Sequence, residues 1–188
     1  MNRRLSWTLV LLVLPTTAAL DLATMPAAAQ KPDAAAKPTP APEKAAVERT
    51  RKTVRMLDDV YKNAVVLITE KYVNKPEDFA AGSAAVALFK NVSKSGHQQV
   101  RLLDVTGDPY EPENVAKDTF EKEGVKRIKA GDAYYDEVVT NDKGKHELRA
   151  ITSIPVVLDK CIMCHPNYAA AKKKGQNIGA ISYTLPID

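Results

Sequence analysis

Hydrophobic residues early in the chain recur with the period of an α-helix. Alternating steps of three and four residues place five of them on one helical face, namely Val54, Leu57, Tyr61, Ala64 and Ile68. This spacing predicts a long amphipathic helix over residues 47–72.

A second helical pattern follows after a break. Pro76 interrupts the first pattern, because proline lacks the amide proton that a helix interior needs. Residues 79–92 are rich in alanine, which has the highest helix propensity, and this stretch ends before Ser95 and Gly96. We therefore expect two helices before the first strand.

The middle of the chain predicts one strand and one helix. Residues 99–105 have the composition of a strand, and the turn-forming residues 106–109 should reverse the chain after it. Residues 113–129 carry apolar side chains at helical spacing, and Gly131 stands where helices commonly end.

Three further strands are expected in the last third of the chain. Residues 134–140 and 148–158 flank a strong hairpin signal at 141–144, and residues 178–185 predict a final strand. Together, these elements predict an α+β fold in which helices cover one face of an antiparallel sheet. We expect a single domain over residues 47–188, since this length suits one hydrophobic core.

Residues 1–29 have the organisation of a secretory signal peptide. Arg3 and Arg4 precede a short apolar core, and small residues offer a cleavage site near Ala29. The apolar core is far shorter than the roughly 20 residues of a membrane-spanning helix. We expect export to the periplasm and no integral membrane segment after cleavage, whereas an uncleaved segment would act as a tether.

Residues 30–46, rich in Ala and Pro, predict an extended linker.

Charge adds little to this picture. The formal net charge is +4, and basic residues are scattered along the chain. The one basic run, lysines 172–174, lacks interleaved aromatic residues and is typical of a solvated loop or helix end. We therefore predict no nucleic-acid partner.

The most informative residues are Cys161, Cys164 and His165, in the segment Cys-Ile-Met-Cys-His. Covalent attachment of haem uses two thiols, spaced to meet the two vinyl groups of one porphyrin. A histidine directly after the second thiol binds the iron from one side. The motif contains both cysteines of the chain and one of its 3 histidines. It predicts one covalently bound haem c with His165 as an axial iron ligand.

Two other interpretations of the cysteine pair are a disulfide and a zinc site. Export would permit a disulfide. However, a thioredoxin-like pair would follow an early strand, whereas this pair lies near the C-terminus and is followed, after His165, by Pro166. A zinc site would need a remote histidine as a further ligand, and the second half of a zinc-finger pattern is absent from the sequence.

The motif leaves the second axial position of the iron undetermined. His97 follows the second predicted helix, where its side chain could face a haem packed on the sheet, and we take it as the candidate distal ligand. Met56 of the first helix and an iron without a second protein ligand are the alternatives. A strand of about eleven residues, more than about 30 Å long, separates His146 from the motif, so we expect it at the wrong end of the sheet.

The residues around the motif resemble those of a known haem-binding family. The motif stands between Ile154-Pro155 and a strand that contains Gly179-Ala180 and ends in Pro186. With these features, residues 54–187 resemble the PAS-like c-type haem domain catalogued as a domain of unknown function. Its members include a cyanobacterial haem protein with a cysteine axial ligand and the extracytoplasmic sensor regions of some bacterial histidine kinases.

The resemblance implies a PAS-like fold with N-terminal helices over the sheet, and haem-binding roles for the motif residues. Upstream, Asn114 and Phe120-Glu121 stand where the family has an Asn-Pro-Arg-Asn loop followed by an aromatic residue and Glu, but the loop arginine is missing. The family's cysteine ligand lies in the region corresponding to residues 84–88, where this chain has no cysteine. Cysteine ligation therefore does not transfer.

We expect a periplasmic redox protein that holds one haem and transfers electrons to or from a partner protein. The cytochrome c maturation machinery would be a second partner. The alternative is a haem-based sensor of gas or redox state that signals through another protein. An enzyme such as a peroxidase would need distal acid-base residues, and no paired His and Arg constellation can be placed over the iron, so we do not expect an enzyme.

Overall fold

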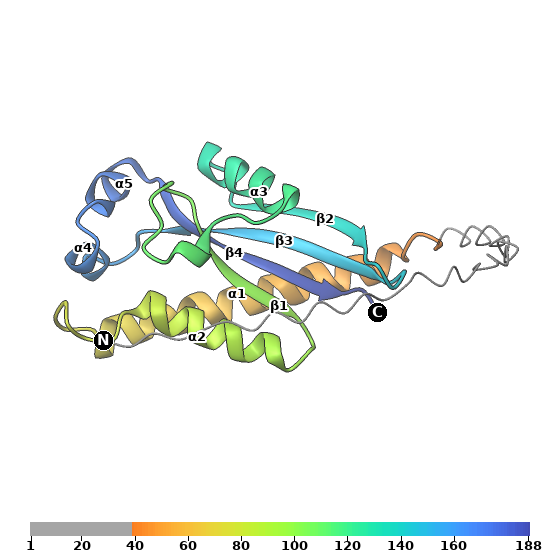
Figure 1. Ribbon diagram of the computed structural model, residues 1–188, viewed down its shortest axis with the longest axis horizontal. Coiled ribbons are helices and arrows are strands. Elements are labelled where there is room, and N and C mark those ends of the chain that lie inside the picture. The colour runs from red at the N-terminus through yellow and green to blue at the C-terminus, as the bar shows by residue number, and fades with distance from the viewer. Residues whose placement is uncertain (1–38) are drawn as a thin grey trace, which may run out of the picture. The chain divides into compact units, whose positions relative to one another are not determined.

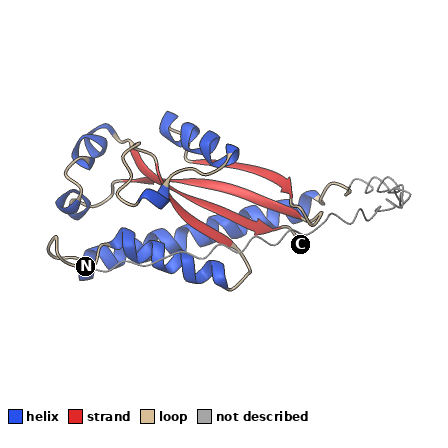
Figure 2. Cartoon of the chain, in the orientation of Figure 1, coloured by secondary structure: helices blue, strands red, loops and turns tan. Residues whose placement is uncertain are grey.

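The structure, a computed structural model, describes residues 39–188. The expected signal peptide and most of the expected linker lie outside the described residues. Figure 1 labels the helices and strands, and Figure 2 colours them by type. In chain order the elements are α1 Lys44–Tyr72, α2 Ala81–Lys94, β1 Gln99–Asp104, the 3-10 helix η1 Pro112–Asn114, α3 Thr119–Ala130, β2 Tyr134–Thr140, β3 His146–Pro155, α4 Lys160–Cys164, α5 Tyr168–Lys174 and β4 Asn177–Pro186.

The four strands form one antiparallel sheet in the order β1-β4-β3-β2. The central strand β4 pairs with both β1 and β3, so that Ile181 lies opposite Leu102 on one side and Thr152 on the other. This arrangement confirms the α+β class and the antiparallel sheet.

Helices cover both faces of the sheet, because successive side chains of a strand point to opposite faces. The face under α1 and α2 is formed around Val54, Tyr61, Phe89, Leu148, Ala150, Ile181, Tyr183 and Leu185. The opposite face packs against α3 through Leu103, Phe120, Ile128, Ile151 and Ala180. The expectation that the N-terminal helices cover the sheet is confirmed, but the expectation that all helices lie on one face is wrong for α3 (Figure 1).

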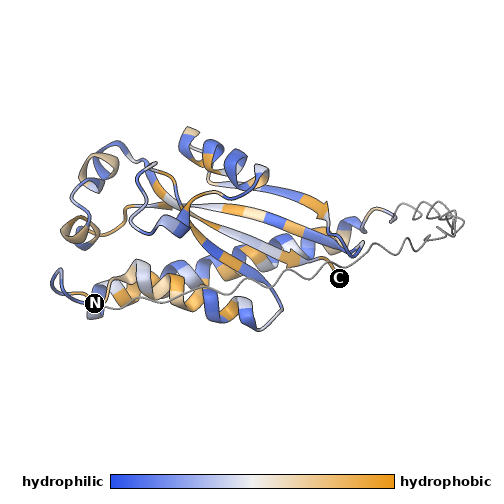
Figure 3. Cartoon of the chain, in the orientation of Figure 1, coloured by the Kyte–Doolittle hydropathy of each residue, from blue (hydrophilic) through white to orange (hydrophobic). Residues whose placement is uncertain are grey.

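Hydrophobic and hydrophilic positions alternate along both N-terminal helices and along the strands in Figure 3. On α1 the buried residues include Val47, Val54 and Tyr61, which recur at helical spacing and face the sheet. Among residues 39–188, none of the helices combines the length and the apolar composition that a membrane span requires.

Several element boundaries differ from the predicted ones: α2 is Ala81–Lys94 rather than 79–92, and β3 is His146–Pro155 rather than 148–158. α1 begins at Lys44, earlier than residue 47. α3 begins at Thr119 rather than at residue 113, because the carboxylate of Asp118 accepts a hydrogen bond from the Glu121 amide at 2.9 Å and so caps the helix there. The preceding residues Pro112–Asn114 form the separate 3-10 helix η1.

We predict that Leu148→Ala lowers the free energy of unfolding by about 2–5 kcal/mol, the usual cost of deleting a fully buried leucine side chain. Leu148 is 0% exposed under α1. Denaturant unfolding measures this value. The same deletion on the outer face of α1, Leu67→Ala, removes a side chain that is 54% exposed and should change the free energy by no more than about 0.5 kcal/mol. Equal effects of the two variants would contradict the assignment of the core.

Candidate functional site

A cavity of about 520 Å³ lies between the N-terminal helices and one end of the sheet. Its volume is within the range of roughly 300–1,000 Å³ that is usual for small-molecule and cofactor sites. The sheet end is the one at which β1 and β3 finish and β4 begins, with Asp104, Pro155 and Gly179 in the wall. The helical wall is formed by Lys62, Val65, Val66, Thr69 and Val73 of α1 and by Ala81, Gly82, Ala85 and Phe89 of α2.

Cys161, Cys164 and His165 all line this cavity. The two cysteines lie on the helix α4 at positions i and i+3, so their side chains lie on the same helical face. The backbone N–H of His165 donates to the carbonyl oxygen of Cys161 at 3.1 Å and ends the helix. Both thiols are free. The sequence did not predict α4 or α5, but the structure brings these three residues together on one wall.

Two tyrosines contact the His165 ring. The ring stacks on Tyr168, with 4.6 Å between the centroids and 21° between the planes. Tyr110 meets the ring edge-on, with 5.5 Å between the centroids. Burial lowers the pKa of His165, which favours the neutral imidazole. A neutral imidazole has a lone pair that is available to bind a metal ion.

Lys160 fixes the motif helix to the C-terminal end of α1. Its ammonium group donates to the carbonyl oxygens of Glu70 and Val73, each at 2.8 Å, and approaches Oδ1 of Asn74 at 3.3 Å. The last carbonyl groups of a helix lack partners within the helix and carry partial negative charge, which favours a cation there. The position of α4 against the cavity therefore depends on a side chain adjacent to the first cysteine.

The structure does not bring His97 to the cavity. His97 is exposed in the loop between α2 and β1. β1 runs from Gln99, beside that loop, to Asp104 in the cavity wall, a distance of about 17 Å at roughly 3.4 Å per residue. The direction of β1 thus places His97 at the opposite end of the strand from the motif.

The other two ligand candidates also lie elsewhere. Met56 is 59% exposed on the outer surface of α1. Nε2 of His146 lies 2.6 Å from the carbonyl oxygen of Pro40, and its Nδ1 lies 3.1 Å from the Thr140 hydroxyl. His146 begins β3, whose other end, at Pro155, lines the cavity.

Sequence reasoning missed three residues that shape the site: Lys160, Tyr110 and Tyr168. Lys160 and Tyr168 are close to the motif in the chain, but nothing in their spacing distinguishes them from ordinary surface residues. Tyr110 follows the turn after β1 and comes near His165 only through the tertiary fold. Among residues 39–188, no group of three or more His, Cys, Asp and Glu side chains is arranged to hold a metal ion.

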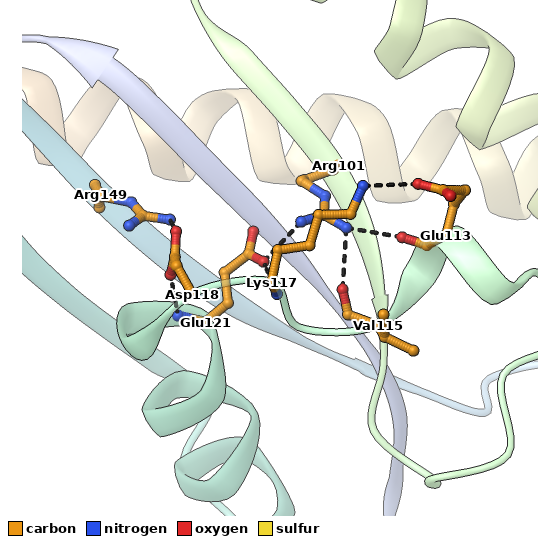
Figure 4. Close-up of polar contacts among 7 residues, drawn as sticks. All are labelled: Arg101, Glu113, Val115, Lys117, Asp118, Glu121 and Arg149. Carbon is orange, nitrogen blue, oxygen red and sulfur yellow. Dashed lines mark hydrogen bonds and ion pairs between the residues drawn. The ribbon is translucent and has the colours of Figure 1, made fainter.

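A second polar cluster lies on the opposite face of the sheet, between β1 and α3 (Figure 4). The Glu121 side chain, 2% exposed, accepts from Arg101 at 2.7 Å and from the Lys117 amide at 2.9 Å. Arg101 also donates to the carbonyl oxygens of Glu113 and Val115. These bonds connect the segment before α3 to the sheet, so the cluster has a structural role. Its arginine belongs to β1.

A family model described as Tll0287-like matches residues 35–186. Among solved structures, the crystal structure of the cyanobacterial haem-protein Tll0287 is similar, with a TM-score of 0.51 and 14% sequence identity. The alignment covers 74% of this chain and 95% of that chain. No curated protein matches the chain.

We predict that Lys160→Met loosens α4 from α1, because it removes the cation from three oxygen acceptors. Hydrogen bonds to a charged group contribute about 1.5–3 kcal/mol, so the backbone amides of α4 should exchange with deuterium at least about tenfold faster. Exchange followed by mass spectrometry measures this effect. Lys173→Met, at an exposed position of α5, is the matched control and should leave α4 unchanged. Unaltered exchange in the Lys160 variant would rule out the anchoring role.

The carboxylate of Asp118 should make the free energy of unfolding depend on pH in the acidic range. Burial opposes its ionisation, but hydrogen bonds from the Glu121 amide and from Arg149, whose Nη2 lies 2.8 Å from Oδ2, outweigh burial and lower its pKa. A carboxyl whose folded pKa lies below the unfolded value of about 3.9 contributes stability above that pH and loses it as the pH falls through the folded pKa.

We therefore predict that Asp118→Asn flattens the acid limb of the stability curve. Between about pH 5 and pH 2.5, the free energy of unfolding should fall less in the variant than in the wild-type protein. Denaturant unfolding at several pH values gives the comparison. Arg149→Met, which removes one of the groups that lower the pKa, should give an intermediate slope. A wild-type slope in both variants would show that Asp118 does not contribute.

Proposed function

The chain belongs to the Tll0287-like family, and on this basis we propose that it binds haem as an exported, monohaem c-type cytochrome with an electron-transfer role in the periplasm. The family match confirms the resemblance drawn from the motif and its flanking strands. The observation that carries the proposal is the convergence of two free thiols and one imidazole on the wall of a single apolar cavity.

The residues around the cavity fit such a group. Cys161 and Cys164 would each form a thioether bond, and the neutral ring of His165 would bind the iron from one side. The stacked ring of Tyr168 restricts the rotation of His165, and Lys160 fixes the helix that carries both thiols. These contacts would hold the donor set in one orientation.

The remaining walls would exclude water. Val65 and Phe89 from the helices and Leu102 from β1 present apolar side chains to the cavity. When bound, haem supplies a one-electron iron couple, whose potential depends on the axial ligands and on the burial of the group. Both cysteines are only partly buried, so the attached edge would lie near the surface, within reach of a redox partner.

Export and maturation are part of the same proposal. The organisation of residues 1–29 as a signal peptide supports delivery to the periplasm, where the cytochrome c maturation machinery attaches haem.

One observation favours the alternative, a sensor of gas or redox state. The residues of α2 that line the cavity are Ala81, Gly82, Ala85 and Phe89, and Ala80 lies directly before the helix; none of them has a ligating side-chain atom. If α2 faces the distal side of the iron, that side stays open to a small ligand. A signal would then pass through a separate partner protein.

We predict that the wild-type protein, expressed with its own leader and the maturation machinery, retains haem on a denaturing gel stained for haem. Cys161→Ala combined with Cys164→Ala should lose the band entirely, because both thioether bonds are gone. His165→Ala should change the absorption spectrum of any attached haem. His97→Ala is the matched histidine control, and its position far from the cavity predicts an unchanged spectrum.

A wild-type protein that folds but gives no stained band would refute covalent attachment. Carbon monoxide separates the two functions once haem is attached. Ready binding to the ferrous protein would favour the sensor, whereas a spectrum that carbon monoxide leaves unaltered would favour the electron carrier.

A further inference from the structure

Lys62, in the cavity wall, forms a charge pair with Asp58 that the proposed haem ligation does not use. Nζ of Lys62 lies 2.7 Å from Oδ2 of Asp58, one turn earlier on α1. Oδ1 of Asp58 accepts from the hydroxyl of Thr152 at 2.6 Å and from that of Tyr183 at 3.0 Å. Thr152 and Tyr183 are 3% and 0% exposed, so the pair is anchored to the buried face of β3 and β4.

Lys62 keeps donors that can reach the cavity. Its ammonium group has three N–H donors, and among residues 39–188 its hydrogen bond goes to Asp58. Lys62 is also part of the cavity wall. The other lysine in that wall, Lys160, already binds three oxygen atoms at the end of α1. Among the described residues, Lys62 is thus the lysine of the cavity wall whose ammonium group has N–H donors that are not already used by protein acceptors.

The cavity extends along α1 from the motif to Lys62. Val73, at the motif end, accepts the hydrogen bond from Lys160 that fixes α4. Lys62 lies eleven residues earlier on α1 in the same wall, which corresponds to about 16 Å at 1.5 Å per residue. Cys161 and Lys62 therefore mark opposite ends of the space.

Haem is asymmetric in a way that matches these two ends. Its two vinyl groups lie toward one edge of the porphyrin, and its two propionate groups lie on the opposite edge. Thioether bonds to Cys161 and Cys164 would hold the vinyl edge at α4, so the propionates point away from the motif. A carboxylate placed in an apolar cavity needs a charged or hydrogen-bonding partner.

We propose that the ammonium group of Lys62 binds a haem propionate and that Asp58 holds the Lys62 side chain in place. This inference rests on the proposed function, since it applies to the same cavity. Asp58 is fixed by Thr152 and Tyr183, and it restricts the flexible lysine side chain to one region of the wall. Burial, followed by the charge of Asp58, raises the pKa of Tyr183, so its hydroxyl remains a donor to Asp58 at neutral pH.

The proposal has a consequence for the reduction potential. The ammonium charge offsets the negative charge of a propionate, and negative charge near the iron favours its oxidised state. Removing the cation should therefore make the haem harder to reduce. One unit charge in a partly buried site is enough to change the ratio of reduced to oxidised protein about tenfold, which is about 59 mV for a one-electron couple.

The test compares haem-loaded variants by spectroelectrochemical titration. Lys62→Met keeps the apolar stem and should lower the reduction potential, whereas Lys62→Arg keeps the charge and should restore it. Lys52→Met removes an exposed lysine of α1 outside the cavity wall and is the matched control. Absorption and EPR spectra of each variant report the coordination of the iron.

A lowered potential in Lys62→Met, with the wild-type value in both other variants and an unchanged iron spectrum, supports the proposal. A potential equal to that of the wild type would overturn it. A change of spin state in Lys62→Met would also overturn it, because Lys62 would then bind the iron itself. A wild-type protein that carries no attached haem would instead refute the proposed function.

Discussion

α1 is longer than the sheet that it covers. The candidate site depends on this difference in length. The helix has 29 residues and is about 43 Å long, whereas the ten-residue strands β3 and β4 extend about 33 Å. Its N-terminal part, as far as Tyr61, packs on the sheet through Val54 and Tyr61. Its C-terminal part, from Lys62 onward, extends toward α4 (Figure 1). Side chains of this part line the cavity. The same amphipathic face thus serves first as core and then as cavity wall.

The strands and long helices could be predicted because their patterns are local. β2 has the predicted bounds, and α1 and α2 follow the spacing of their apolar residues. The start of α3 could not be placed by periodicity, since Asp118 decides it through a hydrogen bond to the Glu121 amide. α4 and α5 are too short to show a period, and α4 depends on contacts with α1 that are distant in the chain.

In the candidate site, too, the local motif could be predicted from the sequence, whereas the parts formed by tertiary contacts could not. Cys161, Cys164 and His165 could be selected from the sequence because the predicted haem attachment requires neighbouring residues, and all three line the cavity. The opposite wall could not be found, because it is assembled by the direction of β1 and the packing of α1 and α2. The place of His97 after a predicted helix favours it as a ligand, yet β1 leads away from it toward the cavity. Lys62 carries no sequence signal, since its position becomes informative only beside Asp58 and the cavity.

The motif also lies in a connection between two strands that are direct neighbours. β3 and β4 pair along nearly their full length, and residues 156–176 leave the sheet and return between them. The pairing does not require any particular conformation of that connection, whose closure costs entropy that grows only slowly with its length. The sheet can therefore close during folding while the thiols are still accessible at its edge. Folding of the sheet therefore does not require that the proposed attachment of haem come first.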